Sequence, residues 1–477
     1  MEDRMAEPSA IQGATTYPAA SFNRNPKEKQ KTDGWEIAVK TAKIIRDVAF
    51  VIGPLLWPFL FAGCASDDPS DSETNPPHVP PPPRDGYLIV TREMFADQLA
   101  PLAASKISKG FNAEIVTLEW IMDPGNLIEG RDPQEKIRNY IIEQYQENNL
   151  RWVLLAGDAD GDENPGASDI PIPTVLDKAW EIPARYVHQP DPCCGYYYFP
   201  ADYYYSALEG TWDENGDGDC ESSEILDLYP NVYVGRLPAQ TQAEMADMAD
   251  KILNYSPVPA QSFLSVGAIM EPIPGSMDQS VLSEYIIANC VPADVDVTTL
   301  YSKDGNLNRT IFNDELNYGG HTLVNTTGHG STQYLFAEGT DYFNFTDVYV
   351  LNNSVPVLWY SNACNNNQFD MYAPNNSISE QLVKLADHGA IAFIGSARVG
   401  VLGRMPDNDI GEYSSAHNVL FWKHFFSGSH RPGEALYQAN LEYSNIFGLT
   451  GVSERGNKFL LLTIMLLGDP ELTIIGE

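Results

Sequence analysis

The stretch "VPVLWYSNACNNNQFD", residues 355–370, passes from an apolar run to a cysteine followed by three asparagines. Such a run is typical of a buried strand, and its abrupt polar end is typical of a loop at the carboxyl end of that strand. The stretch "HTLVNTTGHGST", residues 321–332, has the same construction and ends on a histidine between two glycines. In open α/β sheets, working residues lie on loops beyond the carboxyl ends of the strands. If the two strands are neighbours, the sequence places Cys364 and His329 at one edge of a sheet.

The alternation of short apolar runs with helical periodicity covers the chain from residue 86 onward. This order predicts an α/β fold with mainly parallel sheets flanked by helices. A proline-containing link at 256–262 divides the fold into two tandem subdomains, 86–258 and 259–477, and only the second holds Cys364 and His329. The apolar runs that we expect to form strands include 87–91, 152–158, 263–270 and 390–397.

Composition excludes one class of partner. The chain of 477 residues carries 65 acidic against 29 basic residues and a formal net charge of −36. Such a charge repels phosphate backbones at long range, so we expect no nucleic-acid partner. Six cysteines are too few for a disulfide scaffold in a chain of this size, and the fold must rest on its core. In an oxidising compartment Cys193 or Cys194 could pair with Cys220, and the sequence leaves that pairing open.

The N-terminal part has the anatomy of an export signal. Basic residues precede an apolar run from Val48 to Phe61, and small residues then lead to Cys64. The ending "FAGC" resembles a bacterial lipobox, which implies a lipid on Cys64, a membrane anchor, and a place at the bacterial cell envelope or surface. A short transmembrane segment is the alternative. It is disfavoured because the run is shorter than the roughly 18 residues needed to span and contains two prolines.

These features divide the first part of the chain into three segments. Residues 1–47 form an N-terminal extension to which we assign no role, and residues 48–64 form the signal and lipobox segment. Residues 65–85 are rich in proline, serine and aspartate, a composition that is too polar to bury. We expect this last segment to be a disordered tether between the anchor and the folded body.

The pairing of a strand-end cysteine with a strand-end histidine predicts nucleophilic catalysis. A thiol with a pKa of about 8.5 is a poor nucleophile until a nearby imidazole favours the thiolate. His329 would supply that imidazole to Cys364. The glycines on either side of the histidine would let a substrate backbone approach, and the amides of Gly330 and Cys364 would form a two-donor oxyanion hole. Taken singly, each residue is more often structural, and it is the pair that predicts chemistry.

The two motifs also resemble those of a known family. "LVNTTGHGS" at 323–331 and the cysteine segment resemble the gingipain-type cysteine peptidases of the caspase and legumain-like clan. The resemblance extends to "ADYYYSALEGTWDENGDG" at 201–218, "VYVGRLP" at 232–238 and "LLGDPEL" at 466–472. It implies a caspase-haemoglobinase-like fold, protein or peptide substrates, and peptide-bond hydrolysis through a thioacyl-enzyme.

Carried over residue by residue, the resemblance implies four catalytic groups. Cys364 attacks the scissile carbonyl, His329 transfers protons, and the amides of Gly330 and Cys364 hold the oxyanion. Family members also place an acid behind the histidine, and "VGAIMEP" puts Glu271 at that position. A carboxylate there would fix the tautomer of the imidazole. An exposed loop glutamate is the alternative for Glu271.

The expected substrate pocket departs from the arginine- and lysine-directed members of the family. Depending on the alignment of "GSMDQSVLSEY", either Ser280 or Asp278 takes the pocket position. The loop 395–404 would form another wall, and it brings Arg398 rather than an acid. A preference for basic substrate residues is therefore not implied.

The segment "DENGDGDCESSE", residues 213–224, has the spacing of a calcium-binding loop. Oxygen-bearing residues at alternate positions, a glycine at the turn and a final carboxylate are the pattern that binds this ion. The flanks look like strands, so we expect a structural calcium ion that fixes an insertion in the first subdomain. A solvated acidic turn is the alternative, and we expect no organic cofactor. The predicted ligands are Asp213, Asn215, Asp217, Asp219, Glu221 and Glu224.

The sequence leaves three functions in competition. An exported cysteine endopeptidase is the interpretation that we favour. A sortase-like transpeptidase on the same fold would use the same acyl-enzyme and resolve it with an amine. A catalytically retired, calcium-stabilised surface binding protein is a third interpretation, which the retention of both Cys364 and His329 disfavours.

Overall fold

The computed structural model describes one compact unit of the chain, within Pro81–Glu477. The described residues are 85–476 without 160–177, 192–194, 218–219, 222–227, 259–261, 271–276, 372–375, 402, 407–408 and 448–454. The predicted N-terminal extension, signal and lipobox segment and nearly all of the tether lie outside these residues.

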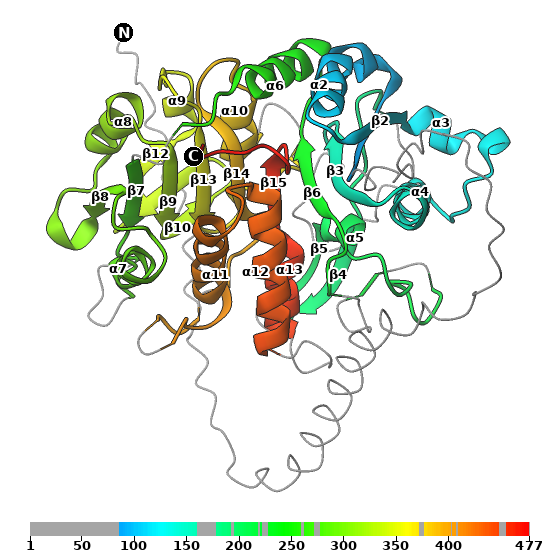
Figure 1. The fold of residues 1–477 in the computed structure, drawn as a ribbon. Helices are drawn as coiled ribbons and strands as arrows, with labels where there is room; N and C mark the ends of the chain where they lie inside the picture. The colour runs from blue at the N-terminus through cyan, green and yellow to red at the C-terminus, as the bar shows by residue number, and fades with distance from the viewer. Residues whose placement is uncertain are drawn as a thin grey trace, which may run out of the picture. The chain divides into compact units, whose positions relative to one another are not determined.

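A ten-stranded sheet forms the centre of the unit, in the order β2-β1-β3-β6-β15-β14-β13-β9-β7-β8 (Figure 1). Every neighbouring pair is parallel except β14 and β15, which are antiparallel. The predicted α/β fold with mainly parallel strands is therefore confirmed. The strands are β1 (Gly86–Thr91), β2 (Asn112–Thr117), β3 (Leu150–Ala156), β6 (Tyr233–Leu237), β7 (Ser262–Gly267), β8 (Asp296–Tyr301), β9 (Leu323–Thr327), β13 (Val357–Asn362), β14 (Ala390–Ser396) and β15 (Ile464–Gly468).

The two expected subdomains share this one sheet. Strand β15 comes from the end of the chain and lies between β6 of the first half and β14 of the second. Leu467 of β15 pairs with Arg236 of β6, and this contact continues the sheet from one half to the other. Sequence periodicity cannot show such a junction, because the pairing joins segments more than two hundred residues apart.

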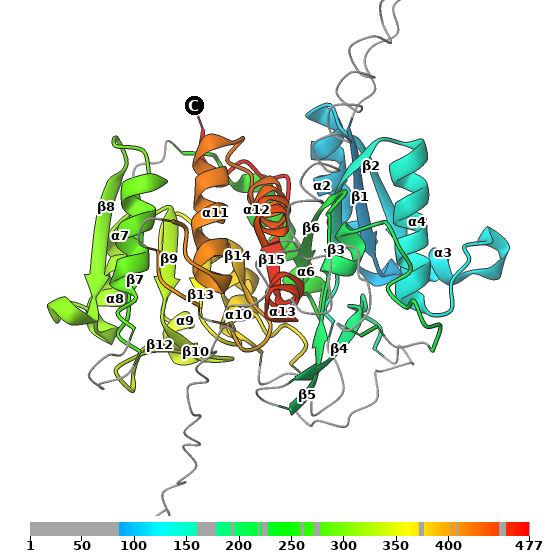
Figure 2. The ribbon, with the colours of Figure 1, turned by 90° about the horizontal axis from the view of Figure 1, so that it is seen from below.

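Helices cover the sheet, and α11 and α12 lie in front of the strands in Figure 1. Figure 2 gives the same arrangement from below, with α7 and α11 side by side. Helix α6 begins with a capping box between Thr241 and Glu244, and α10 begins with the same device between Ser377 and Glu380. The helices are α2 (Ala96–Ser108), α3 (Leu118–Met122), α4 (Pro133–Glu147), α5 (Tyr203–Ser206), α6 (Gln242–Asn254), α7 (Ser280–Asn289), α8 (Arg309–Tyr318), α9 (Phe345–Val348), α10 (Ile378–Lys384), α11 (Tyr413–Ser427), α12 (Pro432–Phe447) and α13 (Arg455–Thr463).

Two small sheets project from this core. One is the hairpin of β4 (Tyr186–Asp191) and β5 (Gly195–Pro200), and the other contains β10 (His329–Ser331), β11 (Tyr334–Ala337) and β12 (Thr340–Asn344). The second small sheet begins directly after β9, so it starts at the carboxyl end of a central strand.

The central strands explain why the apolar runs are continuous. Every residue of β9 and β13 is buried, including Trp359 at 0% exposure. Strands covered by helices on both faces require apolar side chains at successive positions rather than at alternate ones. Within the described residues, no helix is both long enough and apolar enough to cross a membrane.

Candidate active site

The carboxyl ends of β9 and β13 lie side by side. The strands are parallel neighbours, and Thr327 at the end of β9 pairs with Asn362 at the end of β13. The Gly328 amide then donates to the carbonyl of Asn362 over 3.2 Å. His329 and Cys364 each follow this register pair by two residues, and both are half-buried. The structure thus brings the predicted histidine and cysteine to the same edge of the sheet.

Gly330 lies directly against the cysteine loop. A Cβ atom at this position would come within 2.8 Å of the Cys364 carbonyl oxygen and 2.9 Å of the Ala363 Cβ. Real Cβ atoms essentially never come this close to other atoms. The sequence explained this glycine by substrate access, and the structure adds that the histidine hairpin can pack on the cysteine loop only because no side chain intervenes.

The cysteine sulfur receives a backbone hydrogen bond that the sequence analysis did not predict. The Gly400 amide donates to the Cys364 Sγ over 3.3 Å. The Asn365 amide donates to the carbonyl of Arg398 over 2.9 Å, which holds the two loops together. Hydrogen bonds to an ionised acceptor are stronger than those to its neutral form, so this amide favours the thiolate. The expected wall from the 395–404 loop therefore touches the sulfur itself.

A buried asparagine connects the two strand-end segments. Asn366 is 1% exposed, and its side-chain nitrogen donates to the carbonyls of Ser331 at 2.7 Å and Tyr334 at 3.3 Å. Its side-chain oxygen accepts from the Ser361 hydroxyl at 2.7 Å. The sequence signal for this residue was its place in the polar loop after the strand, but nothing in the sequence showed which of the three asparagines would bond to the histidine hairpin.

Two further residues of the hairpin form an aromatic surface beside the histidine. In the register of β10 and β11, Phe336 is directly opposite His329, and Tyr334 is opposite Ser331. The rings of Phe336 and Tyr334 stack with their centroids 5.6 Å apart, and both side chains are half-buried. The edge of the sheet thus combines a thiol, an imidazole and an apolar surface.

Comparison with known proteins decides the family. A sequence model described as Peptidase family C25 matches residues 81–475. The chain belongs to peptidase family C25. It is a cysteine-type peptidase, as the resemblance of its two motifs to the gingipains implied. No curated protein sequence matches the chain.

Three solved protease structures share the fold. The Arg-specific cysteine proteinase gingipain R (RGPB) has 17% identity and a TM-score of 0.57, over 81% of this chain and 78% of that one. The complex of Porphyromonas gingivalis RgpB pro- and mature domains has 17% identity and a TM-score of 0.56, over 82% and 79%. A structure titled only as a protease has 18% identity and a TM-score of 0.55, over 82% and 78%.

Arg398 was expected to face substrate in this C25 peptidase, and the structure gives it another environment. It is 5% exposed, and its guanidinium donates to both carboxylate oxygens of Asp370 at 2.8 and 2.6 Å. It also donates to the carbonyl of Tyr198, and the Tyr186 hydroxyl donates to Asp370. These contacts correct the expectation, because a buried and fully engaged guanidinium holds the loop rather than presenting a charge to a substrate.

The two alternatives for the pocket position differ in exposure. Ser280 is 0% exposed and begins α7 so close to β7 that a Cβ at Gly267 would lie 2.6 Å from its Cα. Asp278 is about one-third exposed, accepts from the Ser280 amide at 2.9 Å and lies 3.9 Å from the Lys303 ammonium. Only the Asp278 carboxylate of this pair is open to solvent. Glu271, the predicted partner of His329, lies outside the described residues.

The first half of the predicted calcium loop makes contacts within the protein. The Asp213 carboxylate forms an ion pair with Arg131 and accepts from the Gly216 amide at 2.8 Å. The Asn215 side chain donates to the Asp217 carboxylate at 2.9 Å. In this arrangement the Arg131 guanidinium is paired with the carboxylate of Asp213, the first predicted ligand. These residues therefore do not fit a calcium site as they stand.

The second half of the loop is described only in part. The Glu221 carboxylate lies 3.6 Å from His188 Nδ1, and Asp219 and Glu224 lie outside the described residues. Among the residues that are described, no group of three histidine, cysteine or acidic side chains is arranged as a metal site. The calcium ion therefore stays a prediction.

A second thiol, Cys290, follows helix α7. Burial raises the pKa of Cys290 to about 11, and its sulfur donates to the Val419 carbonyl at 3.6 Å. Such a thiol is inert at neutral pH. Cys193, Cys194 and the predicted lipidation site Cys64 lie outside the described residues.

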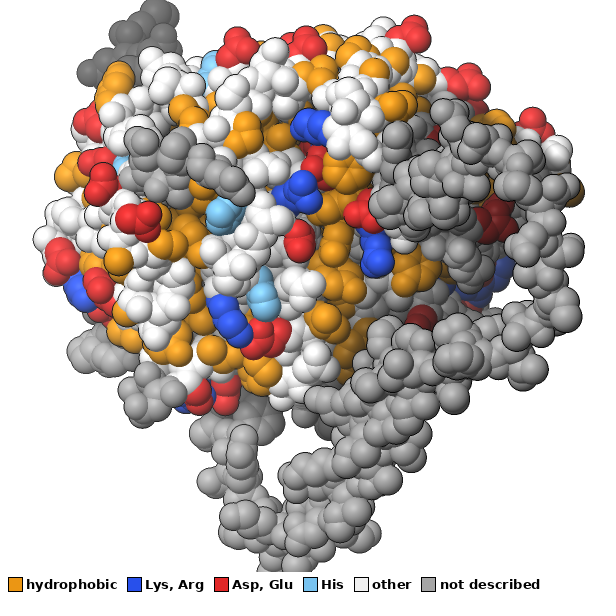
Figure 3. All heavy atoms as spheres, viewed as in Figure 1, with side chains coloured by type: hydrophobic (Ala, Val, Ile, Leu, Met, Phe, Trp, Pro, Cys, Tyr) orange, Lys and Arg blue, Asp and Glu red, His pale blue; other side chains and the backbone are white. Residues whose placement is uncertain are grey.

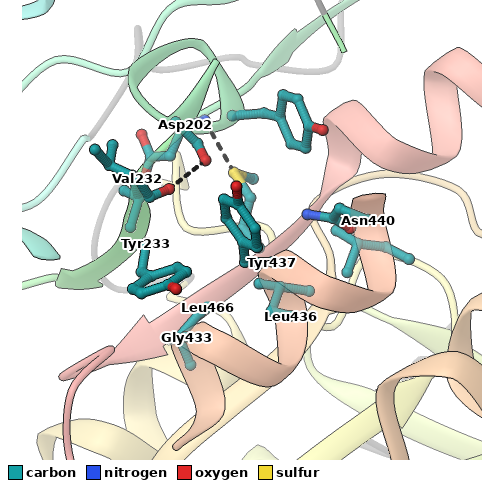
Figure 4. A pocket seen from close by; sticks show the side chains of 13 residues that line it. Asp202, Val232, Tyr233, Gly433, Leu436, Tyr437, Asn440 and Leu466 are labelled. Carbon is teal, nitrogen blue, oxygen red and sulfur yellow. Dashed lines mark hydrogen bonds between the residues drawn. The ribbon is translucent and has the colours of Figure 1, made fainter. Parts of the chain in front are cut away.

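One pocket lies between β6, α12 and β15, and Figure 4 shows its lining. It is lined by Asp202, Tyr233 and Tyr437 among others, and its volume of about 30 Å³ is enough for a single water molecule. Neither His329 nor Cys364 lines it. We therefore assign it no part in substrate binding.

Proposed function

We propose that the protein is an exported cysteine endopeptidase whose catalytic dyad is Cys364 and His329. The observation that carries the proposal is the register of β9 and β13, which sets the two strand ends side by side. The contact of Gly330 with the Cys364 carbonyl adds that the histidine hairpin rests on the cysteine loop. An imidazole beside a thiol is the arrangement that activates a cysteine nucleophile.

The proposed reaction uses each group in turn. His329 takes the proton of the Cys364 thiol, and the thiolate forms a bond to the scissile carbonyl carbon. The amides of Gly330 and Cys364 hold the oxyanion that develops. The imidazolium then gives its proton to the leaving amine, and the C–N bond breaks to leave a thioester. Water, deprotonated by His329, attacks the thioester and releases the carboxylic acid and the thiol.

Glu271 completes the proposal as the residue that orients the imidazole. A carboxylate hydrogen-bonded to one ring nitrogen would hold His329 in the tautomer that leaves the other nitrogen facing the thiol. A Glu271→Gln variant would retain the hydrogen-bonding shape and lose the charge. We expect it to lower kcat and to leave KM nearly unchanged.

A thiol-directed peptidyl probe tests the dyad. We expect labelling of the wild-type protein at a single site, loss of labelling in Cys364→Ala, and much slower labelling in His329→Ala. Cys290→Ala is the matched control, because it removes a thiol whose pKa is about 11 and should change nothing. Unchanged labelling of Cys364→Ala would favour a binding protein on a retired peptidase fold. Product masses with and without an added amine separate hydrolysis from transpeptidation.

We also propose export with a lipid anchor on Cys64. The support is the basic, apolar and small-residue order of the segment that ends in "FAGC". Mass spectrometry of the mature N-terminus should find a lipid-modified Cys64, and Cys64→Ser should release the protein from membranes. The net charge of −36 favours solubility on an exposed surface, and acidic side chains are spread over the face shown in Figure 3.

A structural calcium ion in the 213–224 loop is part of the same proposal, supported by the ligand spacing. Binding would require the Asp213 carboxylate to exchange Arg131 for the ion. Isothermal titration with calcium, for the wild type and for Glu224→Gln, tests this. An absence of heat in the wild type would leave a solvated acidic turn.

A further inference from the structure

Asn366 is a buried side chain that joins the segment that carries Cys364 to the hairpin that carries His329. Asn366 follows the cysteine by two residues and is 1% exposed. Its side-chain nitrogen donates to the carbonyl of Ser331 at 2.7 Å and to that of Tyr334 at 3.3 Å. Both acceptors belong to the hairpin that begins at His329. The amide therefore bridges the two segments whose separation decides the reaction.

The orientation of this amide is fixed by a chain of hydrogen bonds from the core. The Trp359 indole donates to the Thr326 hydroxyl at 2.9 Å, Thr326 donates to the Ser361 hydroxyl at 3.2 Å, and Ser361 donates to the Asn366 oxygen at 2.7 Å. These three residues are at most 2% exposed. An indole only donates, and a hydroxyl has one proton to give. The direction of the chain thus leaves the Asn366 nitrogen to face the hairpin.

Asn366 also fills the space that glycine leaves at position 330. A Cβ atom on Gly330 would lie 2.7 Å from the Asn366 nitrogen. A missing side chain on the hairpin and a bridging amide from the cysteine loop are therefore complementary. Together they set how closely the two segments approach.

We infer that Asn366 is a positioning residue that fixes the separation between the Cys364 sulfur and the His329 imidazole. The inference rests on the dyad of the proposed function. Asn366 acts through the two segments that it joins. An ion pair between thiolate and imidazolium weakens as the two groups separate, and a displacement of about 1 Å can lower a rate about 100-fold.

The test compares Asn366→Ala with a matched control, Asn353→Ala. Asn353 is 6% exposed, and its side chain also bridges backbone groups, at 2.7 Å to Val355 and at 3.0 and 2.8 Å to Gly389. It precedes β13, whereas Asn366 follows that strand. Loss of either asparagine removes buried hydrogen bonds and lowers stability to a similar degree. Only the loss of the Asn366 side chain should change the geometry of the dyad.

The rate at which iodoacetamide alkylates Cys364 is measured between pH 5 and pH 10, by mass spectrometry of the peptide that contains Cys364. The rate of hydrolysis of a peptide substrate is measured alongside. We expect Asn366→Ala to raise the apparent thiol pKa toward the free value of about 8.5 and to lower kcat about 100-fold with little change in KM. We expect Asn353→Ala to keep the wild-type profile.

A folded Asn366→Ala variant with the wild-type thiol pKa and kcat would overturn the inference, and so would an equal shift in Asn353→Ala. If Asn366→Ala does not fold, Asn366→Ser replaces it, because a serine hydroxyl is too short to bridge Ser361 and the hairpin and should give the same shift. Hydrolysis that survives Cys364→Ala would instead overturn the dyad itself.

Discussion

The Gly400 amide donates a hydrogen bond to the Cys364 sulfur over 3.3 Å. The two residues follow β14 and β13, which are parallel neighbours, so their loops meet at the carboxyl edge of the sheet. A backbone amide that faces a sulfur stabilises its anion and has no side chain that sequence analysis could recognise. The proposed nucleophile thus has a fixed donor on one side in addition to the histidine hairpin on the other.

Removal of that donor should raise the pKa of the Cys364 thiol. Gly400→Pro lacks the amide hydrogen, whereas Gly400→Ala keeps it, and a Cβ atom there would meet nothing closer than 3.8 Å. We expect the proline variant to be alkylated at least about 10-fold more slowly at pH 7, because one lost hydrogen bond to a charged group is worth about 1.5–3 kcal/mol. The alanine variant should match the wild type. Equal rates in all three proteins would show that the amide has no influence on the thiolate.

Gly330→Ala should separate the histidine hairpin from the cysteine loop. The new methyl group would overlap the Cys364 carbonyl and the Ala363 side chain, and neither can move without moving the nucleophile. We expect kcat/KM for a peptide to fall at least about 100-fold, since about 1 Å of misplacement has this effect. Gly400→Ala provides the matched glycine control, and circular dichroism checks that the variant folds. Retention of activity would show that the hairpin lies further from the reacting atoms than its contacts with the cysteine loop indicate.

The sequence predicted the parts of the site that follow local rules. The strand ends just before His329 and Cys364 could be read from apolar runs with polar ends, and the α/β class followed from the alternation of apolar runs with helical periodicity. Gly400 and Asn366 act through contacts between loops that are distant in sequence, which no periodicity reports. Arg398 was expected in a wall of the substrate pocket because its loop follows a predicted strand, although its partner Asp370 lies in the polar stretch that first marked the cysteine.

Arg398→Ala should affect stability far more than substrate recognition. It would leave the Asp370 carboxylate buried without its guanidinium, and the loss of one partner of a buried ion pair costs about 3–5 kcal/mol. We expect urea denaturation to show a free energy of unfolding that is lower by about 3–5 kcal/mol. At temperatures where the variant is folded, KM values for peptides with different P1 residues should change together. A change in KM confined to one class of P1 residue would show that Arg398 contacts the substrate.

Activity toward basic P1 residues should be weak relative to that of dedicated arginine-directed enzymes. The Asp370 carboxylate is already engaged by Arg398 and Tyr186, and the Asp278 carboxylate is only about one-third exposed and lies 3.9 Å from a lysine. A cleavage profile over a peptide library measures the preference. Strong cleavage after arginine that disappears in Asp278→Asn would show that Asp278 fills the pocket.

A buried acidic cluster makes stability depend on pH. Glu380 at the start of α10 is 0% exposed, and burial, followed by the nearby charge of Asp158, raises its pKa to about 8. The Lys384 ammonium lies 3.5 Å from Glu380 and 3.4 Å from Asp158, so two carboxylates share one cation. In the unfolded chain a glutamate ionises near pH 4.3, whereas the folded protein keeps this proton until about pH 8. The contribution of Glu380 to the free energy of unfolding therefore decreases as pH rises through this interval.

Glu380→Gln should remove this dependence and stabilise the protein at pH 8. Glutamine keeps a side-chain oxygen that can accept hydrogen bonds from the Ser377 amide and hydroxyl, which donate to Glu380 at 2.8 and 2.9 Å. Unlike the carboxyl group, the glutamine side chain does not ionise. Urea denaturation should show that the variant gains more free energy of unfolding over the wild type at pH 8 than at pH 5. Glu244→Gln is the matched control, because Glu244 makes the same capping box in α6 at a half-buried position. An unchanged pH dependence in Glu380→Gln would mean that it comes instead from Asp158, whose pKa is also raised by burial.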